Sequence, residues 1–470
     1  METKSKRDRV KYEHEGHLFC FAKFNSDMSV KFWRCDKRDS DDCKARLHTS
    51  SETGEVIKLI SVHTHGSDAA GVAASKIRTA IKRRAEETLE APSTIVNQAL
   101  EGAPIAVQGK IGNADALKKI IQRKRVVVQA APAQPADLTS LVIPEIYQTY
   151  ELTPGQEEKF LLIDTGMGDT SRILIFGRHS TINWAHQMER VYVDGTFRIA
   201  PTLFSQVYVI MAERGGFVVP ILYALLPNKT EETYRRMWEK IKNLWSNFKP
   251  TSISTDFEQA ALNSIRYAFP GVQLFGCLFH LQKNMRKKLS DEGLMSLYNN
   301  NPDFALAARK IVALAFVPPT SMEDAFEDLC NETPHELQPI LNWFEDSYLG
   351  RPNRRGVRRP AMFPIHVWTV YERTLNGNAR TNNFVEAAHR RMQVEFGVDH
   401  PTLWKFIDGI RKIQAGRDHH YEQFVRGEEP PHKRKKYLRA DERILKIVQE
   451  YANRTNDEYL RGIAHNFLMN

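Results

Sequence analysis

Long apolar runs, a secretory leader and a cysteine framework are all missing from this sequence. No stretch of about 18 apolar residues occurs in the 470 positions, so we expect no membrane-spanning helix. The first nine residues are largely charged and lack the apolar segment that a secretory signal needs. The five cysteines are unevenly placed, which argues against a disulfide framework and favours a reduced, intracellular compartment.

The composition is that of a folded chain with a moderate basic excess. Hydrophobic residues make up 42% and aromatic residues 10%, enough for a substantial core, which excludes wholesale disorder. At roughly 150 residues per domain, the length predicts about three domains. The 66 basic and 57 acidic residues give a net charge of +9. Such an excess indicates a nucleic-acid partner only where the positive charges cluster.

The pattern of apolar residues divides the chain into a small β region, a charged helical region and a longer α/β region. Strand patterns occupy residues 17–24, 31–35, 45–50 and 56–63, followed by charged helical patterns at 76–89 and 114–125 and a Pro/Ala linker at 130–136. Further strands are predicted at 159–164, 172–176, 191–197, 205–212, 217–226, 252–255 and 272–275, with helices at 181–188, 231–245 and 258–269. Residues 278–375 look mostly helical, and helices follow at 383–396 and from 403.

Two cysteines and two histidines near the N-terminus have the composition of a structural zinc site. Cys35 and Cys43 are separated by seven residues, and His63 and His65 follow. Two thiolates and two imidazoles can close a tetrahedral zinc site. On a strand, the His-x-His spacing would place both imidazoles on one face. A region of about 70 residues with a small core also needs a cross-link such as a bound metal ion to be stable.

Two aspartates end apolar strands in the α/β region. Asp194 ends one strand and Asp256 ends another, and a run of strands with a crossover helix separates them. A charge at a strand end usually marks only the point where the chain meets water. If these two strands are neighbours, however, the carboxylates converge, and hard oxygen ligands of this kind suit Mg²⁺ or Mn²⁺.

Glu386 is the best candidate for a third carboxylate. It lies in the first turn of a predicted helix that Thr381 or Asn382 could cap. His389 and Arg390 follow at i+3 and i+4 on the same face, and both suit a phosphate-bearing substrate. Acids early in helices normally just complement the helix dipole. Two other acids could in principle serve but are less well placed: Glu372 and Glu395.

The N-terminal region resembles a FLYWCH-type zinc finger over about residues 12–67. The resemblance rests on Leu18, Phe24, Phe32-Trp-Arg-Cys35, Cys43-Lys-Ala-Arg-Leu47 and His63-Thr-His65. One departure is Phe32, where the family often has tyrosine. The resemblance implies a small zinc-bound antiparallel sheet that binds DNA, with Cys35, Cys43, His63 and His65 as the zinc ligands.

The α/β region resembles the Mutator-like (MULE) transposases over roughly residues 150–415. The shared motifs, in order, are Val193-Asp-Gly-Thr-Phe197, Thr255-Asp-Phe-Glu258, Gly276-Cys-Leu-Phe-His280 and Thr381-Asn-Asn-Phe-Val-Glu386. The resemblance implies an RNase H-like catalytic core with a helical insertion before the glutamate. It also implies a triad of Asp194, Asp256 and Glu386 that holds Mg²⁺ or Mn²⁺.

Cys277 and His280 form the Cys-x-x-His pair that accompanies this core in the family. A buried thiol with a hydrogen-bonded histidine is one interpretation, and a pair beside the active site that positions DNA is the other. Two ligands are too few for a zinc site, so we assign no metal here. His389 and Arg390 are expected in a similar supporting or DNA-binding role.

The expected fold is therefore multidomain α+β: a small zinc-bound antiparallel finger followed by an RNase H-like α/β core with a helical insertion. The expected domains are a finger at 12–67, a helical linker or auxiliary DNA-binding region at 71–135, the first part of the core at 145–290, the helical insertion at 291–375, the core helix with the third carboxylate at 376–415 and a basic helical tail at 416–470. Residues 76–128 are either a helix-turn-helix or a plain helical spacer.

The function predicted from this pattern is that of a DNA transposase, which cleaves and transfers DNA strands at a two-metal Asp-Asp-Glu site. Its partners would be double-stranded DNA of the transposon ends and of the target, with no membrane partner; whether the chain forms a homo-oligomer is left open. Basic runs support a DNA partner, although such runs are usually only solvated faces, and the one at 433–436 suits a nuclear location. The rivals are a transposase-derived regulatory DNA-binding protein without catalytic activity and an RNase H-type nuclease that cuts RNA–DNA hybrids.

Overall fold

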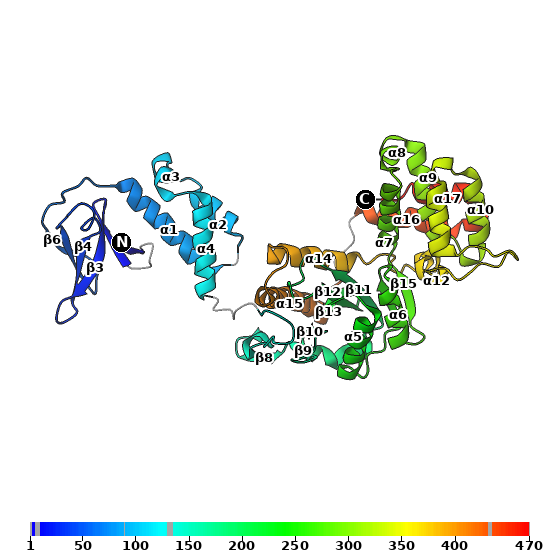
Figure 1. Cartoon of the computed structure of the whole chain (residues 1–470), viewed down its shortest axis with the longest axis horizontal. Coiled ribbons are helices and arrows are strands. Elements are labelled where there is room, and N and C mark those ends of the chain that lie inside the picture. The colour runs from blue at the N-terminus through cyan, green and yellow to red at the C-terminus, as the bar shows by residue number, and fades with distance from the viewer. Residues whose placement is uncertain (1, 5–9, 89, 129–134, 431–434, 470) are drawn as a thin grey trace. The chain divides into compact units, whose positions relative to one another are not determined.

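The computed structural model describes residues 2–4, 10–88, 90–128, 135–430 and 435–469 (Figure 1). The chain divides into two compact units, Met1–Ala133 and Gln134–Asn470. Most of the predicted linker at 130–136 and the first part of the basic run at 433–436 lie outside the described residues.

An antiparallel sheet of six strands, paired in chain order, opens the first unit. Its strands are β1 (Glu2–Lys4), β2 (Val10–His14), β3 (His17–Phe24), β4 (Val30–Cys35), β5 (Arg46–Ser50) and β6 (Val56–Ile60). The four predicted strands are confirmed as β3 to β6, and β1 and β2 are additional. The core of the sheet is small: Phe19, Trp33 and Leu47 form its apolar cluster, and the indole Nε1 of Trp33 donates to Thr49 Oγ1 at 2.9 Å.

Four helices complete the first unit: α1 (Ala69–Glu87), α2 (Pro92–Leu100), α3 (Ile105–Ile111) and α4 (Ala114–Val128). The predicted charged helices correspond to α1 and α4, and the two short helices between them were not predicted. The four helices share an apolar cluster that includes Ile81, Ile95, Val107 and Ile121. This region therefore folds around a core of its own.

A mixed sheet of seven strands, in the order β15-β14-β11-β12-β13-β10-β9, forms the centre of the second unit. The strands are β9 (Leu161–Asp164), β10 (Leu174–Phe176), β11 (Arg190–Thr196), β12 (Gln206–Arg214), β13 (Phe217–Leu226), β14 (Ser252–Thr255) and β15 (Gln273–Gly276). β14 pairs in parallel with β11 and with β15, and the other pairings are antiparallel. A separate hairpin of β7 (Thr149–Thr153) and β8 (Gln156–Lys159) precedes this sheet.

Helices cover both faces of the sheet (Figure 1). The first face packs against α5 (Glu231–Leu244) and α6 (Gln259–Ala268), where Trp238 and Leu262 join the sheet residue Val193 in one core. The second face packs against α14 (Asn383–Phe396) and α15 (Leu403–Val425), where Met392 and Phe406 form another core with sheet side chains. Strands buried on both faces explain why the sequence of β12 and β13 is almost continuously apolar.

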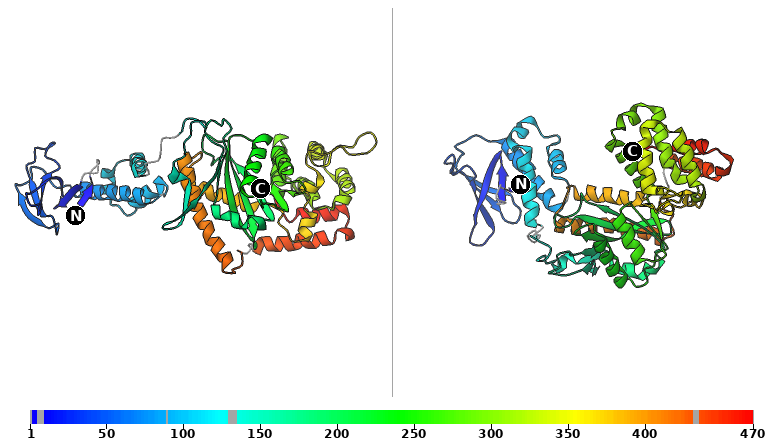
Figure 2. Two further views of the ribbon diagram at one scale, coloured as in Figure 1. Left: turned by 90° about the horizontal axis from the view of Figure 1, so that it is seen from below. Right: turned by 45° about the vertical axis from the view of Figure 1, so that its right-hand side comes forward.

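A helical lobe lies beside the sheet (Figure 2). It contains α7 (Leu278–Asp291), α8 (Met295–Asn300), α9 (Pro302–Ala313), α10 (Met322–Glu332), α11 (Gln338–Phe344), α12 (Ile365–Trp368) and α13 (Tyr371–Leu375). The C-terminal helices α16 (Lys435–Gln449) and α17 (Asn456–Ala464) pack on it: Tyr459 donates to the carbonyl of Phe316, and Lys310 pairs with Asp457 at 2.5 Å. The segment expected as a basic tail thus contributes apolar side chains to the core of the lobe.

Membrane-crossing requires a helix that is both long and apolar, and none of the helices in the described part of the chain meets both conditions.

Candidate functional site

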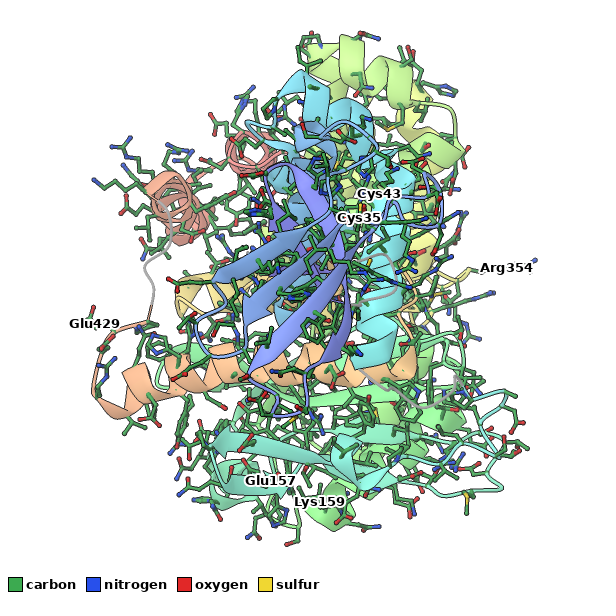
Figure 3. All side chains as sticks on the ribbon, turned by 90° about the vertical axis from the view of Figure 1, so that its left-hand side faces the viewer. Cys35, Cys43, Glu157, Lys159, Arg354 and Glu429 are labelled. Carbon is green, nitrogen blue, oxygen red and sulfur yellow. The ribbon has the colours of Figure 1, made fainter. Side chains whose placement is uncertain are left out.

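The first candidate site is a group of two cysteines and two histidines at one end of the six-stranded sheet. Cys35 ends β4, Cys43 lies in the loop before β5, and His63 and His65 follow β6. The Sγ atom of Cys35 lies 3.2 Å from Nε2 of His65, and the Sγ atom of Cys43 lies 3.4 Å from Nδ1 of His63. All four ligand atoms lie within 4.8 Å of one another. Figure 3 shows the two cysteines side by side.

These distances fit a tetrahedral zinc ion. Zinc bonds of about 2.3 Å to sulfur and about 2.1 Å to nitrogen place neighbouring ligand atoms about 3.6 Å apart. Burial raises the pKa of the Cys35 thiol to about 12, so this thiol stays neutral unless a cation stabilises the thiolate. The predicted set of zinc ligands is therefore brought together by the fold.

The local prediction for the histidines was wrong in one respect. β6 ends at Ile60, so His63 and His65 do not lie on a strand. They reach the cysteines from the loop that leads to α1, where His65 Nδ1 is 2.9 Å from the carbonyl oxygen of Gly66. His17 was not predicted to lie near this group. Its ring stacks on that of His63, with 3.6 Å between the ring centroids.

The second candidate site is a buried group of carboxylates and histidines in the second unit. Asp194, from β11, is only 4% exposed. Its Oδ2 lies 3.9 Å from Nε2 of His280 in α7, and the same nitrogen is 3.4 Å from Oε1 of Glu386 in the first turn of α14. Nδ1 of His389, one turn further along α14, is 3.7 Å from Oδ2 of Asp194. Ligand atoms of Asp194, His280 and Glu386 all lie within 4.8 Å of one another.

Strand pairing places Asp256 at the same edge of the sheet. β11 and β14 are parallel neighbours, with Tyr192 opposite Ser254, and each aspartate follows two residues later in its strand direction. The carboxylate of Asp256 is not part of the group of atoms within 4.8 Å, but its negative charge contributes to the raised pKa values of Asp194 and Glu258. The fold thus brings Asp194 and Glu386 into contact distance of one histidine and leaves Asp256 beside them.

Asn382 connects the start of α14 to both strands. Its Nδ2 donates to the carbonyl oxygens of Val193 at 3.3 Å and Ser254 at 3.2 Å. Its backbone N–H donates to the Sγ atom of Cys277 at 3.1 Å. The prediction that Asn382 or Thr381 caps the helix was wrong, because the helix has no side-chain cap and Asn382 is turned toward the sheet. An asparagine just before a helix is also the common pattern of a side-chain cap, so the sequence alone does not distinguish the two arrangements.

The electrostatics of the group depend on burial and on mutual charge. Burial raises the pKa of Asp194 to about 7. The negative charges of Asp256 and Glu386 also raise this pKa, whereas the positive charge of His280 lowers it. Interactions with Cys277 and Glu386 raise the pKa of His280 to about 11 although burial opposes the shift. The hydrogen bond from His280 lowers the pKa of Glu386, and burial lowers that of His389 to about 4. His280 lies between the two carboxylates, and its charge when protonated offsets theirs.

The remaining predicted residues are placed differently. Cys277, just before α7, is a buried thiol that accepts a hydrogen bond from the backbone N–H of Asn382. Arg390 is exposed on α14. The two alternative acids, Glu372 and Glu395, are also exposed. Neither belongs to the metal-type groups found among the described residues.

The loop at 351–359 carries five arginines, and at least two of them are paired with acids. Arg351 pairs with Asp346, and Arg358 pairs with Glu345 at 2.8 Å and Glu323 at 3.1 Å. Arg354 projects from the loop into solvent (Figure 3).

Comparison with known proteins identifies both regions. Residues 190–284 match the model of the MULE transposase domain, and residues 2–65 match that of the FLYWCH zinc finger domain. FLYWCH transcription factors 2 and 3 of Caenorhabditis elegans are 31% and 36% identical to this chain over 64 and 59 residues. These alignments cover 14% and 13% of this chain and 13% of each relative, so the chain spans only a small part of the curated relatives it matches.

Among solved structures, the Drosophila P element transposase strand transfer complex is 12% identical, covering 73% of this chain and 92% of that chain, with a TM-score of 0.28. A likeness of that extent does not establish a common fold. The MULE match includes Asp194, Asp256 and His280, whereas Glu386 lies beyond its end.

Proposed function

We propose that this chain, which carries a FLYWCH zinc finger and a MULE transposase domain, is a DNA transposase that cleaves and transfers DNA strands at a metal site formed by Asp194, Asp256 and Glu386. The observation that carries the proposal is the convergence of acids that are far apart in sequence. Asp194 and Glu386 come from a strand and a helix, yet each is within 4 Å of His280, and Asp256 ends the parallel neighbour of the strand that carries Asp194.

We further infer an RNase H-like core. The support is the order β13-β12-β11-β14-β15, in which three consecutive antiparallel strands are extended on one side by two parallel ones, with helices on both faces. Carboxylates that follow neighbouring parallel strands meet at one edge of such a sheet. The position of α14 across that edge, attached through Asn382, brings the glutamate to the same place.

The residues present suit a pair of divalent cations. Burial, together with the negative charges of Asp256 and Glu386, raises the pKa of Asp194, and hard oxygen donors of this kind are the ligands of Mg²⁺ and Mn²⁺. Nδ1 of His280 and Nε2 of His389 are buried and have no hydrogen-bond partner among the described residues. Bound cations would supply an activated water and stabilise the leaving oxygen at the scissile phosphate.

The protein's own residues hold and orient this site. His280 donates to Glu386, which fixes the carboxylate relative to the strands, and Asn382 keeps α14 in register with β11 and β14. Arg390, exposed one turn after Glu386, would contact phosphate of the bound DNA. The zinc finger would bind double-stranded DNA of the element's ends, and the protein would act in the nucleus.

The test is strand cleavage of duplex DNA that carries the inverted repeats flanking the coding sequence, in Mg²⁺ and in Mn²⁺. Wild type should cleave, and Asp194→Asn and Asp256→Asn should not, while DNA affinity without metal stays within about twofold because the phosphate contacts come from Lys and Arg. Glu395→Gln is the matched control. If wild type binds the DNA but does not cleave it, the protein is instead a transposase-derived regulatory protein that keeps the fold.

A further inference from the structure

A polar cavity of about 280 Å³ lies in the second unit, apart from the carboxylate group. It is bounded by the 3-10 helix η2 (His179–Gln187), the first part of β13 and the C-terminal half of α15. The β13 residues Val219 and Pro220 pair with the part of β12 that opposes the beginning of β11, whereas Asp194 lies near the end of β11. None of the residues of the carboxylate group lines this cavity.

The walls of the cavity carry excess positive charge. Three arginines line it, of which Arg178 is neutralised by Asp418 at 2.8 Å and by Glu158 at 2.5 Å. Arg214 and Arg417 have no carboxylate partner among the residues that the structure describes, and Nε of Arg417 is buried without a hydrogen-bond partner. An unpaired, partly buried guanidinium is costly, so an anion in the cavity would be stabilised by these two groups.

Two aromatic rings form another wall. The rings of Trp184 and Tyr421 lie 6.5 Å apart with an angle of only 24° between their planes. They also hold Arg214 in place: its Cζ is 4.9 Å from the Trp184 centroid and 5.3 Å from that of Tyr421, whose hydroxyl accepts from Nη1 at 2.9 Å. Flat aromatic faces stack on bases of any sequence, and guanidinium groups bind phosphate through two parallel hydrogen bonds.

We propose that this cavity binds one nucleotide, with the base against Trp184 and Tyr421 and the phosphate on Arg214 and Arg417. A simple inorganic anion would make no use of the aromatic wall. The volume is near the lower end of the roughly 300–1,000 Å³ range of small-molecule pockets, which suits a single base with its sugar. A free nucleoside phosphate and one nucleotide of a single DNA strand have this chemistry in common.

The experiment measures quenching of tryptophan fluorescence in the full chain without added Mg²⁺ or Mn²⁺, using ATP and a single-stranded oligo(dA) as the two probes. We expect saturable quenching that disappears in Trp184→Phe, which keeps an aromatic ring but removes the reporter. Arg417→Gln should weaken binding at least about tenfold, since a charge-assisted hydrogen bond is lost. Lys412→Gln removes an exposed positive charge from the same helix outside the cavity and should bind like wild type.

The two probes distinguish the sources of the nucleotide. Quenching by ATP that is weakened by Arg417→Gln supports a free nucleotide, and quenching by oligo(dA) alone with the same sensitivity supports a nucleotide of a DNA strand. Should Arg417→Gln lower the melting temperature, Arg417→Lys keeps the charge without the planar fork and should still bind severalfold more weakly than wild type. If neither ATP nor oligo(dA) quenches the fluorescence, or if the Arg417 and Lys412 variants bind the probe equally well, the proposal is overturned.

Discussion

Replacing Cys35 with serine should remove zinc and unfold the six-stranded sheet while the second unit stays folded. The sheet has little else to stabilise it. Its apolar cluster consists of three buried side chains, Phe19, Trp33 and Leu47, whose burial contributes on the order of 5–9 kcal/mol at about 1.5–3 kcal/mol each. A structural zinc ion in a small finger contributes about 10–16 kcal/mol, so loss of the ion removes more stabilisation than the apolar cluster supplies.

The assay combines zinc content with thermal unfolding of the full chain. Wild type should hold about one zinc per chain and should lose the unfolding transition of the sheet when a chelator is added. Cys20→Ser is the matched control, because Cys20 is a half-buried cysteine of the same sheet that lies outside the ligand group. Equal zinc content in Cys35→Ser and Cys20→Ser would refute the assignment of the site.

Two further predictions concern α14. Glu386→Gln keeps the size of the side chain but removes the charge needed to hold a cation, so strand cleavage should be abolished, whereas exposed Glu395→Gln should be nearly silent. If Glu395→Gln abolished cleavage and Glu386→Gln did not, the face of α14 that carries Glu395, not the one that carries Glu386, would form the site. Asn382→Ala removes two buried hydrogen bonds to the strands, about 2 kcal/mol in total, and should lower the melting temperature of the second unit, Gln134–Asn470, by about 3 °C. Asn383→Ala, exposed at the next position, should leave it unchanged; equal melting of both variants would contradict the role of Asn382.

The strands and helices of the second unit were largely predictable because their patterns are strong. β12 and β13 are almost continuously apolar, as strands buried on both faces must be, and α14 begins and ends at the predicted residues 383 and 396. The strands β1 and β2 were missed because their short sequences, such as Val-Lys-Tyr-Glu-His, are dominated by polar residues. The side chains of β2 are at most half-buried.

The predicted site depends on contacts that local sequence patterns do not encode. The parallel pairing of β11 with β14 and the two hydrogen bonds from Asn382 follow from the tertiary fold, and only the resemblance to a family suggested that Glu386 joins the aspartates. The polar cavity could not be predicted from the sequence, because its residues Trp184, Arg214 and Arg417 come from three separate elements and share no motif.

Binding of Mn²⁺ by the full chain tests the central claim most directly, since that claim is that acids from β11, β14 and α14 form one metal site. Electron paramagnetic resonance of free Mn²⁺ counts the bound ions. Wild type should bind Mn²⁺ in a mode that is lost in Asp194→Ala and equally lost in Glu386→Gln, while Glu395→Gln binds like wild type. If Asp194→Ala abolishes binding and Glu386→Gln leaves it unchanged, the two carboxylates do not share a metal site, and the account is contradicted.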